Sequence, residues 1–450
     1  MKILQFVTDA LGDASYLLIE GPVAAAIDPQ RDVRPLRQAA AEHGARITHV
    51  FETHVHNDYI SGGRELAAHG AQVVAPRAAN LQFPHLPVDD GDEIAVGEAR
   101  LRAVAAPGHT YEHTAYLAIG PDGAIAGAFT GGSLLMGGAG RTDLLGPDHT
   151  EELTRLQWET AQRLSTLLPS MAEVLPTHGA GSFCSTTGMP DDRRAPLSQE
   201  RERNSALTAG TLEVFRMVHL ASLAPIPSYY RHMAPINRAG PGVFGEPPRP
   251  RALLPEELED LLRSNIPVVD VRARVDYAAG FIPGTLHIED SGSFLAYVGW
   301  TLPFNSPLAL VSYDSSQSER LTVDLFRVGY EDIRGFLPYQ QWLAAGRDTD
   351  PLPTAGLDQA AEALRTRSLP VLDVRFANEQ HDLPLPGAIE RPVDQIRDWA
   401  DSIDDEPHLV VCESGQRAAM AASILAARGK PVIPVIEGGA STLLPMMRRR

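Results

Sequence analysis

The chain has 450 residues, of which 44% are hydrophobic and 21% are charged, a composition that indicates a folded protein of several domains and excludes a disordered chain. Its 39 basic and 57 acidic residues give a net charge of −18, which disfavours nucleic acids and anionic membranes as partners. With two cysteines, no signal-peptide pattern and no apolar run of the ~18 to 20 residues that span a bilayer, the sequence excludes a disulfide framework and predicts a cytoplasmic protein.

Residues 1–235 are predicted to form one layered α/β domain, in which short strands alternate with helices. In chain order, the apolar patterns predict strands at 2–7, 15–19, 23–27, 47–51, 72–75, 93–96, 100–105 and 114–119, and helices at 33–43, 60–69 and 150–168. The short connections between several strands favour antiparallel pairing. Polar motifs follow several of these strands, where open sheets commonly present their functional groups.

Candidate metal ligands follow three strand-like runs of this domain. The motifs at these strand ends contain, in chain order, His54, His56 and Asp58, then His109, then His178. Imidazole and carboxylate groups are the ligands that zinc and non-haem iron bind in proteins, and their convergence at one sheet edge explains why all of them follow strands. The sequence therefore predicts a metal site with His54, His56, Asp58 and His109 as ligands and His178 at its pocket.

The order of these motifs resembles the metallo-β-lactamase fold over about residues 1–235. The matching segments, in the family's order, are His54-x-His56-x-Asp58, Gly108-His109-Thr110, Phe129-Thr130-Gly131 and Gly140-Arg141-Thr142-Asp143-Leu144. The glycine-rich stretch that ends at Asp143 and the motif around His178 are similar to the persulfide dioxygenase branch. This resemblance implies one Fe(II), with zinc as the alternative metal, held by two histidines and one carboxylate, with open positions for a persulfide and O₂. The histidines that match are His54 and His109.

Two ligand positions of the family are not matched in this chain. Gly132 stands where the family has an aspartate, and Tyr59 stands where the two-zinc hydrolase branch has a histidine after Asp58. The candidates for a replacement third ligand are Asp58, Asp143, His56 and water. A site with only two histidines would hold a divalent metal more weakly.

The remainder of the chain is predicted to contain a duplicated domain. A stretch rich in proline and glycine, 236–252, is predicted to be a linker. After it, residues 266–272 match residues 369–375, and a period of about 100 residues fits a duplicated domain rather than a solenoid. Each copy alternates strand and helix patterns, which is typical of a parallel α/β sheet. We place the two copies at 253–345 and 357–450.

The second copy contains a cysteine in a loop that opens a helix. After a buried strand, the six residues Cys412-Glu413-Ser414-Gly415-Gln416-Arg417 lead into an alanine-rich helix. Free N–H groups at the start of a helix lower the pKa of a thiol and make it a nucleophile. Arg417 adds positive charge for an anionic donor such as thiosulfate. We therefore predict Cys412 and Arg417 as catalytic residues, and Glu413, Ser414, Gly415 and Gln416 as the loop around a persulfide.

This segment resembles the rhodanese family over about residues 357–450. The cysteine loop, Asp373-x-Arg375, Pro386-Gly387 and Glu437-Gly438-Gly439 occur in the family's order. The resemblance implies a sulfurtransferase, in which Cys412 takes a sulfane sulfur and a thiol acceptor removes it. The first copy has Ser312 at the position of Cys412, and we predict that this copy is inactive because a hydroxyl is a poor sulfur acceptor.

Together, these features predict an α/β multidomain protein: a metallo-β-lactamase αββα sandwich followed by a degenerate and an active-type rhodanese domain, each with a parallel sheet. The expected function is oxidation of a glutathione-type persulfide by O₂, coupled to sulfane sulfur transfer from a persulfide or thiosulfate, as in sulfide detoxification. A homo-oligomer is compatible with the sequence. Cys184 is a candidate second thiol, although a small buried thiol is the simpler interpretation. Two alternatives remain open: a zinc-dependent glyoxalase-type thioester hydrolase, and a sulfurtransferase with a non-catalytic N-terminal domain.

Overall fold

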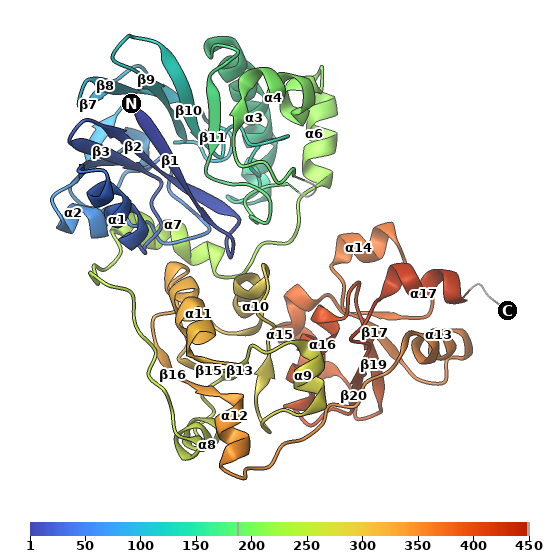
Figure 1. The fold of residues 1–450 in the computed structure, drawn as a ribbon. Helices are drawn as coiled ribbons and strands as arrows, with labels where there is room; N and C mark the ends of the chain where they lie inside the picture. Colours follow the sequence, from blue (N-terminus) through green and yellow to red (C-terminus); the bar gives the residue numbers. More distant parts are fainter. Residues whose placement is uncertain (187–188, 448–450) are drawn as a thin grey trace. The chain divides into compact units, whose positions relative to one another are not determined.

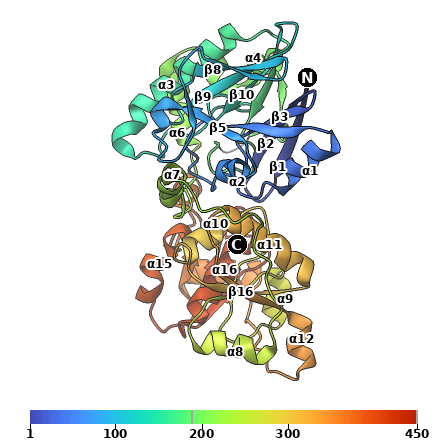
Figure 2. The ribbon, with the colours of Figure 1, turned by 90° about the vertical axis from the view of Figure 1, so that its left-hand side faces the viewer.

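The computed structural model describes residues 1–186 and 189–447, and its backbone divides into two units, residues 1–247 and the residues from Pro248 onward (Figure 1). Each unit is built around β-sheets with helices on their outer faces (Figures 1 and 2). Among the residues that the structure describes, no helix combines the length and the hydropathy that spanning a bilayer requires.

The first unit is an αββα sandwich of two six-stranded sheets. The first sheet has the order β1-β2-β3-β4-β5-β6, and its strands are β1 (Lys2–Thr8), β2 (Asp13–Glu20), β3 (Val23–Ile27), β4 (Arg46–Phe51), β5 (Gln72–Pro76) and β6 (Leu86–Val88). The second sheet has the order β12-β11-β10-β9-β8-β7, and its strands are β7 (Glu93–Val96), β8 (Ala99–Ala105), β9 (Thr114–Ile119), β10 (Ile125–Gly131), β11 (Glu173–Pro176) and β12 (Ala195–Pro196). The helices are α1 (Arg34–Glu42), α2 (Gly63–Ala68), α3 (Pro147–Leu167), α4 (Leu197–Arg203), α5 (Ser205–Thr208), α6 (Leu212–Ala221) and α7 (Tyr230–Ala239).

Strand β2 shows why this unit has three layers of core. Successive side chains of a strand point to opposite faces, and both faces of β2 are apolar. Tyr16 and Leu18 join the core between the two sheets, whereas Leu17 and Ile19 pack under α1 on the outer face. Helix α3 covers the outer face of the second sheet through Ala161 and other apolar residues. The eight predicted strands and three predicted helices lie here; β3, β7 and β9 have the predicted ends and the other elements have shifted ends. Strands β6, β10, β11 and β12 and helices α4 to α7 are additional to the predicted elements.

The second unit contains two four-stranded parallel sheets with the same strand order. In the first copy, β14-β13-β15-β16 consists of β13 (Val268–Asp270), β14 (Leu286–His287), β15 (Leu308–Ser312) and β16 (Ile333–Pro338). In the second copy, β18-β17-β19-β20 consists of β17 (Val371–Asp373), β18 (Ile389–Glu390), β19 (His408–Val411) and β20 (Val432–Pro434). The helices are α8 (Pro255–Arg263), α9 (Arg274–Ala279), α10 (Phe294–Thr301), α11 (Ser315–Arg327) and α12 (Tyr339–Ala344), then α13 (Leu357–Thr366), α14 (Ala377–Asp382), α15 (Ile396–Trp399), α16 (Gln416–Ala426) and α17 (Ala440–Met447).

The two copies also share the register of their central strands. Asp270 pairs with Val311 in the first copy, and Asp373 pairs with Val411 in the second. Because the register is the same, the next residue of each copy, Ser312 and Cys412, occupies the equivalent place at the end of its strand. The loop that should carry a nucleophile therefore begins at the same point of both sheets. The described residues thus form a mixed α/β chain, an αββα sandwich followed by parallel-sheet α/β domains, as the sequence predicts.

Candidate functional site

Loops that follow β4, β8 and β11 bring buried histidines together in the first unit. The ring centroid of His54 lies 4.9 Å from that of His109 and 5.3 Å from that of His178, and the rings of His109 and His178 are 5.1 Å apart. All three side chains are buried. One nitrogen of each ring can point to a common centre, because ligand atoms of the three histidines lie within 4.8 Å of one another.

The second nitrogen of each of these rings is held by an oxygen atom. Nδ1 of His54 lies 2.9 Å from Thr53 Oγ1, and Nδ1 of His109 lies 2.7 Å from the carbonyl oxygen of Arg141. Nδ1 of His178 lies 3.0 Å from Asp13 Oδ1. Nε2 of His54 then lies 3.4 Å from Nε2 of His178. Nε2 of His109 is buried without a hydrogen-bond partner within the described part of the chain. Anchored Nδ1 atoms with inward Nε2 atoms are the usual arrangement of metal-binding histidines, so these residues fit a metal ion.

Burial and charge give these histidines different protonation. Burial, together with the neighbouring imidazoles, lowers the pKa of His54 and of His109 well below the ordinary value, so both rings are neutral and can donate an electron pair to a metal. Burial also tends to lower the pKa of His178, but the charges of Asp58 and Asp13 outweigh burial and raise this pKa to about 9. A metal ion bound by His178 would therefore replace a proton.

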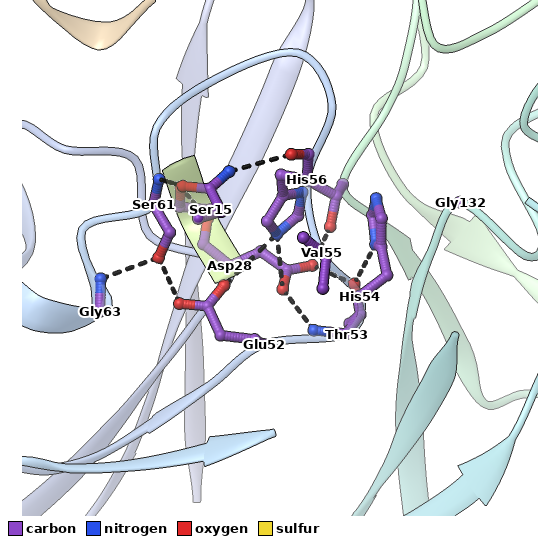
Figure 3. Close-up of polar contacts among 12 residues, drawn as sticks. Ser15, Asp28, Glu52, Thr53, His54, Val55, His56, Ser61, Gly63 and Gly132 are labelled. Atoms are coloured by element: carbon purple, nitrogen blue, oxygen red, sulfur yellow. Dashed lines mark hydrogen bonds and ion pairs between the residues drawn. The ribbon is translucent and has the colours of Figure 1, made fainter. Parts of the chain in front are cut away.

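His56 belongs to a second, acidic group with Asp28 and Glu52, next to His54 (Figure 3). Its Nε2 lies 3.2 Å from Asp28 Oδ1, 3.4 Å from Glu52 Oε2 and 3.1 Å from the Tyr59 hydroxyl. Although burial opposes it, Asp28 and Glu52 raise the pKa of His56 well above the ordinary value. His56 is thus a buried imidazolium paired with carboxylates. Helix α7 fixes this loop, because Asn237 Nδ2 donates to the carbonyls of His56 and Tyr59.

Gly132 makes room for the His109 ring. A Cβ atom at Gly132 would lie 2.4 Å from His109 Cδ2, and one at Gly140 would lie 2.8 Å from His109 Nδ1, which is far closer than such atoms approach. The ring therefore lies flat against two glycine backbones, where the side chain of the family's aspartate would begin. At the other unmatched position, Tyr59 donates to the Asp28 carbonyl and stacks on His56 with centroids 4.4 Å apart.

The remaining candidate ligands have other partners. Asp58 Oδ2 lies 3.1 Å from His178 Nδ1, so Asp58 orients His178 from behind. Asp143 pairs with the buried guanidinium of Arg141 at 2.7 Å. The structure thus brings His178, which the sequence placed only at the pocket, together with His54 and His109.

The sequence analysis missed three buried carboxylates that surround the histidines. Asp13 begins β2, Asp28 follows β3 and Glu52 follows β4. The histidines were identified because they follow strands. The same criterion would have identified Asp28 and Glu52. No comparable signal exists for Asp13, because it lies at the start of a strand.

Cys184 is a buried thiol of the first unit. Its side chain is completely buried, as is that of Cys412, and burial together with the charges of Asp58 and Asp13 raises the pKa of the Cys184 thiol well above the ordinary value. A thiol that stays protonated is a poor nucleophile. The structure therefore favours the simpler of the two interpretations of Cys184.

In the second unit, Cys412 lies where β19 ends and α16 is about to begin. The backbone N–H of Gly415 donates to Cys412 Sγ at 3.1 Å. Gly415 has φ +91°, and a Cβ there would lie 2.1 Å from the Ile436 carbonyl oxygen, so the turn requires glycine. The loop thus directs one backbone amide toward the sulfur.

Arg417, at the other end of the loop, is bound to a carboxylate. Its two terminal nitrogens donate to the two carboxylate oxygens of Glu379, one of them at 2.8 Å, and its guanidinium lies 4.6 Å from the centroid of the Phe376 ring. The arginine is 8% exposed. The sequence analysis did not identify Glu379, which lies on α14, 38 positions before Arg417.

Comparisons with known proteins agree on the first unit. No family model matches the chain. The chain is 32% identical to a hydroxyacylglutathione hydrolase of Methylococcus capsulatus over 256 residues, which are 55% of this chain and 93% of that protein. It is 29% identical to the mitochondrial persulfide dioxygenase ETHE1 of Homo sapiens over 228 residues, which are 50% of this chain and 82% of that protein. Three other hydroxyacylglutathione hydrolases are 34 to 36% identical, and the chain spans about half of their length.

One solved structure covers more of the chain. A crystal structure of a metallo-β-lactamase from Staphylococcus aureus has a TM-score of 0.66 and 26% identity, and the match covers 75% of this chain and 98% of that chain. The likeness therefore extends beyond the αββα sandwich into the second unit.

Proposed function

Because the chain belongs to the metallo-β-lactamase-fold family that includes the hydroxyacylglutathione hydrolases, we propose that its first unit is a metal-dependent enzyme for a glutathione-type sulfur compound. The proposed reaction is the oxidation of a low-molecular-weight persulfide, in which R–S–SH, O₂ and water give R–SH, sulfite and two protons. The proposed metal is a single Fe(II). The likeness to a persulfide dioxygenase over 228 residues supports this choice of reaction.

The observation that carries the proposal is the set of three anchored imidazoles, His54, His109 and His178. Three imidazoles suit a first-row transition metal and leave coordination positions free for small ligands. Iron(II) bound there would supply open positions at which a persulfide and O₂ meet. We propose that His178 replaces the carboxylate that Gly132 cannot provide.

The protein's own groups prepare this site. Thr53 Oγ1, the Arg141 carbonyl and Asp13 fix the three rings, so the donor atoms need no rearrangement when a metal binds. Asp58 adds negative charge 3.1 Å from His178 Nδ1, which raises the basicity of that ligand.

A two-metal thioester hydrolase is the second candidate, favoured by 32% identity to a hydroxyacylglutathione hydrolase. The donor set argues against it. A second metal would need ligands at positions 59 and 132, where this chain has Tyr59 and Gly132, and His56 is engaged by Asp28 and Glu52.

For the second unit, we propose that Cys412 is the nucleophile of a sulfurtransferase. The Gly415 amide 3.1 Å from Sγ supports this role, because a persulfide anion on Cys412 would be stabilised by it. A thiol acceptor would then take the sulfur. In the first copy, Ser312 stands at the equivalent place, and the carboxylate of Asp314 accepts the Gln317 N–H that begins α11.

Metal content and oxygen uptake test the first half of the proposal. We expect about one iron per chain in wild type, with oxygen consumed on addition of glutathione persulfide. His178→Gln should lose both the iron and the oxygen uptake. His149→Gln, which changes an exposed histidine of the same unit, is the matched control and should retain the iron.

Two results would contradict the proposal. Cleavage of S-lactoylglutathione without oxygen uptake, by protein with two metals per chain, would favour the hydrolase. Retention of iron in His178→Gln would show that His178 is not a ligand.

A further inference from the structure

The positive charge beside Cys412 is already neutralised within the protein. Arg417 presents two parallel N–H donors, and both are bound by the carboxylate of Glu379. This bidentate geometry is the strongest that arginine forms, and it occupies the pair of terminal N–H donors that could otherwise bind a thiosulfate sulfonate. Glu379 is itself fixed, because its Oε2 also accepts the Phe376 N–H at 2.9 Å.

The other charged groups around the loop do not restore a net positive charge beside Cys412. Glu413 follows Cys412 directly and accepts the Ser441 N–H, so a second carboxylate belongs to the loop. Asp394 lies within electrostatic reach of Arg417 and adds a third. Arg375, the other buried arginine of this copy, donates to Asp373 at 2.6 Å. The groups around Cys412 thus have a negative balance, which disfavours a dianion.

We propose that Glu379 determines the donor specificity of the Cys412 loop: by holding Arg417, it disfavours thiosulfate and makes the loop selective for hydropersulfides. This inference rests on the proposed sulfurtransferase function of Cys412. Glu379 acts through Arg417 and is therefore a positioning residue.

Sulfur transfer from a hydropersulfide requires no binding site for a dianion. The Cys412 thiolate attacks the terminal sulfur of R–S–SH, the S–S bond of the donor breaks, and its electron pair leaves on the inner sulfur. The proton of the terminal sulfur moves to that leaving thiolate, which gives R–SH and a Cys412 persulfide anion. With thiosulfate the leaving group is the sulfite dianion, so charge accumulates where the carboxylates already lie.

The test compares donors in single-turnover reactions of the full chain. Mass spectrometry measures the gain of one sulfur atom on Cys412 from thiosulfate or from glutathione persulfide, at a series of donor concentrations. Glu379→Gln removes the charge but can still cap α14 through its side-chain oxygen, so the loop should fold. We expect the thiosulfate concentration for half-maximal rate to fall at least tenfold, equivalent to about 1.4 kcal/mol, with little change in the maximal rate.

Three further variants separate this effect from a general one. Glu379→Asp keeps the charge and should keep the wild-type preference. Arg417→Met in the Glu379→Gln background should abolish the gain, because the effect acts through Arg417. Glu406→Gln removes an exposed carboxylate that precedes β19, at the opposite end from Cys412, and should not change the preference.

The outcomes distinguish this inference from the function on which it rests. An unchanged donor preference in Glu379→Gln, with sulfur still reaching Cys412, would overturn the inference and leave the sulfurtransferase intact. Failure of every donor to modify wild-type Cys412 would overturn the proposed function and the inference with it.

Discussion

At the scale of single residues, Gly132 limits where the His109 ring of the candidate metal site can lie. Gly132 lacks the carboxylate of related proteins, but the space is not vacant, because the His109 ring lies against its backbone. His178 lies close to His54 in the same site, with 3.4 Å between their Nε2 atoms.

Restoring the aspartate should weaken metal binding rather than strengthen it. In Gly132→Asp, the new Cβ would lie 2.4 Å from His109 Cδ2, so the ring must leave its position. We expect the affinity for Fe(II) or Zn(II) to fall about tenfold or more, a typical cost of disturbing the support of a ligand. Competition with a chelator of known affinity measures this change.

Gly132→Ala is the control, because it adds the Cβ without the carboxylate. It should lose a similar affinity if displacement of the ring is the cause. A gain of affinity in Gly132→Asp would show that position 132 can still ligate, and it would contradict the three-histidine set.

At the scale of elements, the same ion pair anchors the first strand of both copies in the second unit. Asp270 and Arg272 form it in the first copy, with Nη2 to Oδ2 at 2.7 Å, and Asp373 and Arg375 form it in the second at 2.6 Å. Arg375 Nη2 also donates to the Leu383 carbonyl just after α14. The pair therefore ties the strand to the helix that carries Glu379.

Breaking this pair should destabilise the second copy strongly. Asp373→Asn leaves the buried charge of Arg375 without a counterion, and such a loss costs about 3 to 5 kcal/mol of unfolding free energy. Urea denaturation followed by tryptophan fluorescence measures it. Asp401→Asn, which breaks the exposed pair with Arg428, is the control and should cost less than about 1 kcal/mol. Equal costs for the two variants would contradict this account.

At the scale of the whole molecule, the two copies of the second unit bury contacts with each other. The His287 N–H of the first copy donates to Ser423 Oγ on α16 at 2.9 Å, and Arg274 Nε donates to the Ile436 carbonyl at 2.8 Å. These bonds join β14 and α9 of the first copy to the helix and loop beside Cys412. The first copy therefore supports the second although it lacks a nucleophile.

His287 makes this unit sensitive to acid. Burial, with a contribution from Arg272 and Arg274, lowers the pKa of His287 to about 4, whereas an unfolded histidine has a pKa of about 6.5. Stability is complete above pH 6.5 and is lost as the pH falls toward 4, because the unfolded chain takes up the proton first. We expect a loss of about 2 kcal/mol between pH 7 and pH 5 from this group.

Urea denaturation at the two pH values measures this dependence, and three of the four tryptophans, Trp300, Trp342 and Trp399, report on the second unit. His287→Gln should reduce the difference between the two pH values. His381→Gln, at an exposed histidine of the same unit, should leave it unchanged. A pH dependence that is the same in wild type and His287→Gln would exclude His287 as its source.

The sequence by itself determined the class of fold and the neighbourhood of the chemistry. Continuous apolar runs indicate strands that are buried on both faces, and the repeat after residue 252 implies two like sheets, which the structure shows with equivalent strand order. Position at a strand end is a local property that a sequence displays, so His54, His109, His178 and Cys412 could be identified as candidates.

Only the tertiary structure decided which carboxylate each buried histidine or arginine pairs with. Asp28 and Glu52 engage His56, Asp13 holds His178 from a distance of 165 positions, and Glu379 binds Arg417 from 38 positions away. Such pairings depend on the packing of distant loops, and the pKa of a buried group depends on every charge around it. The strand pattern in the sequence specifies the position of a side chain on its strand or loop. Its protonation state and its interaction partners depend on the groups that the complete fold places beside it.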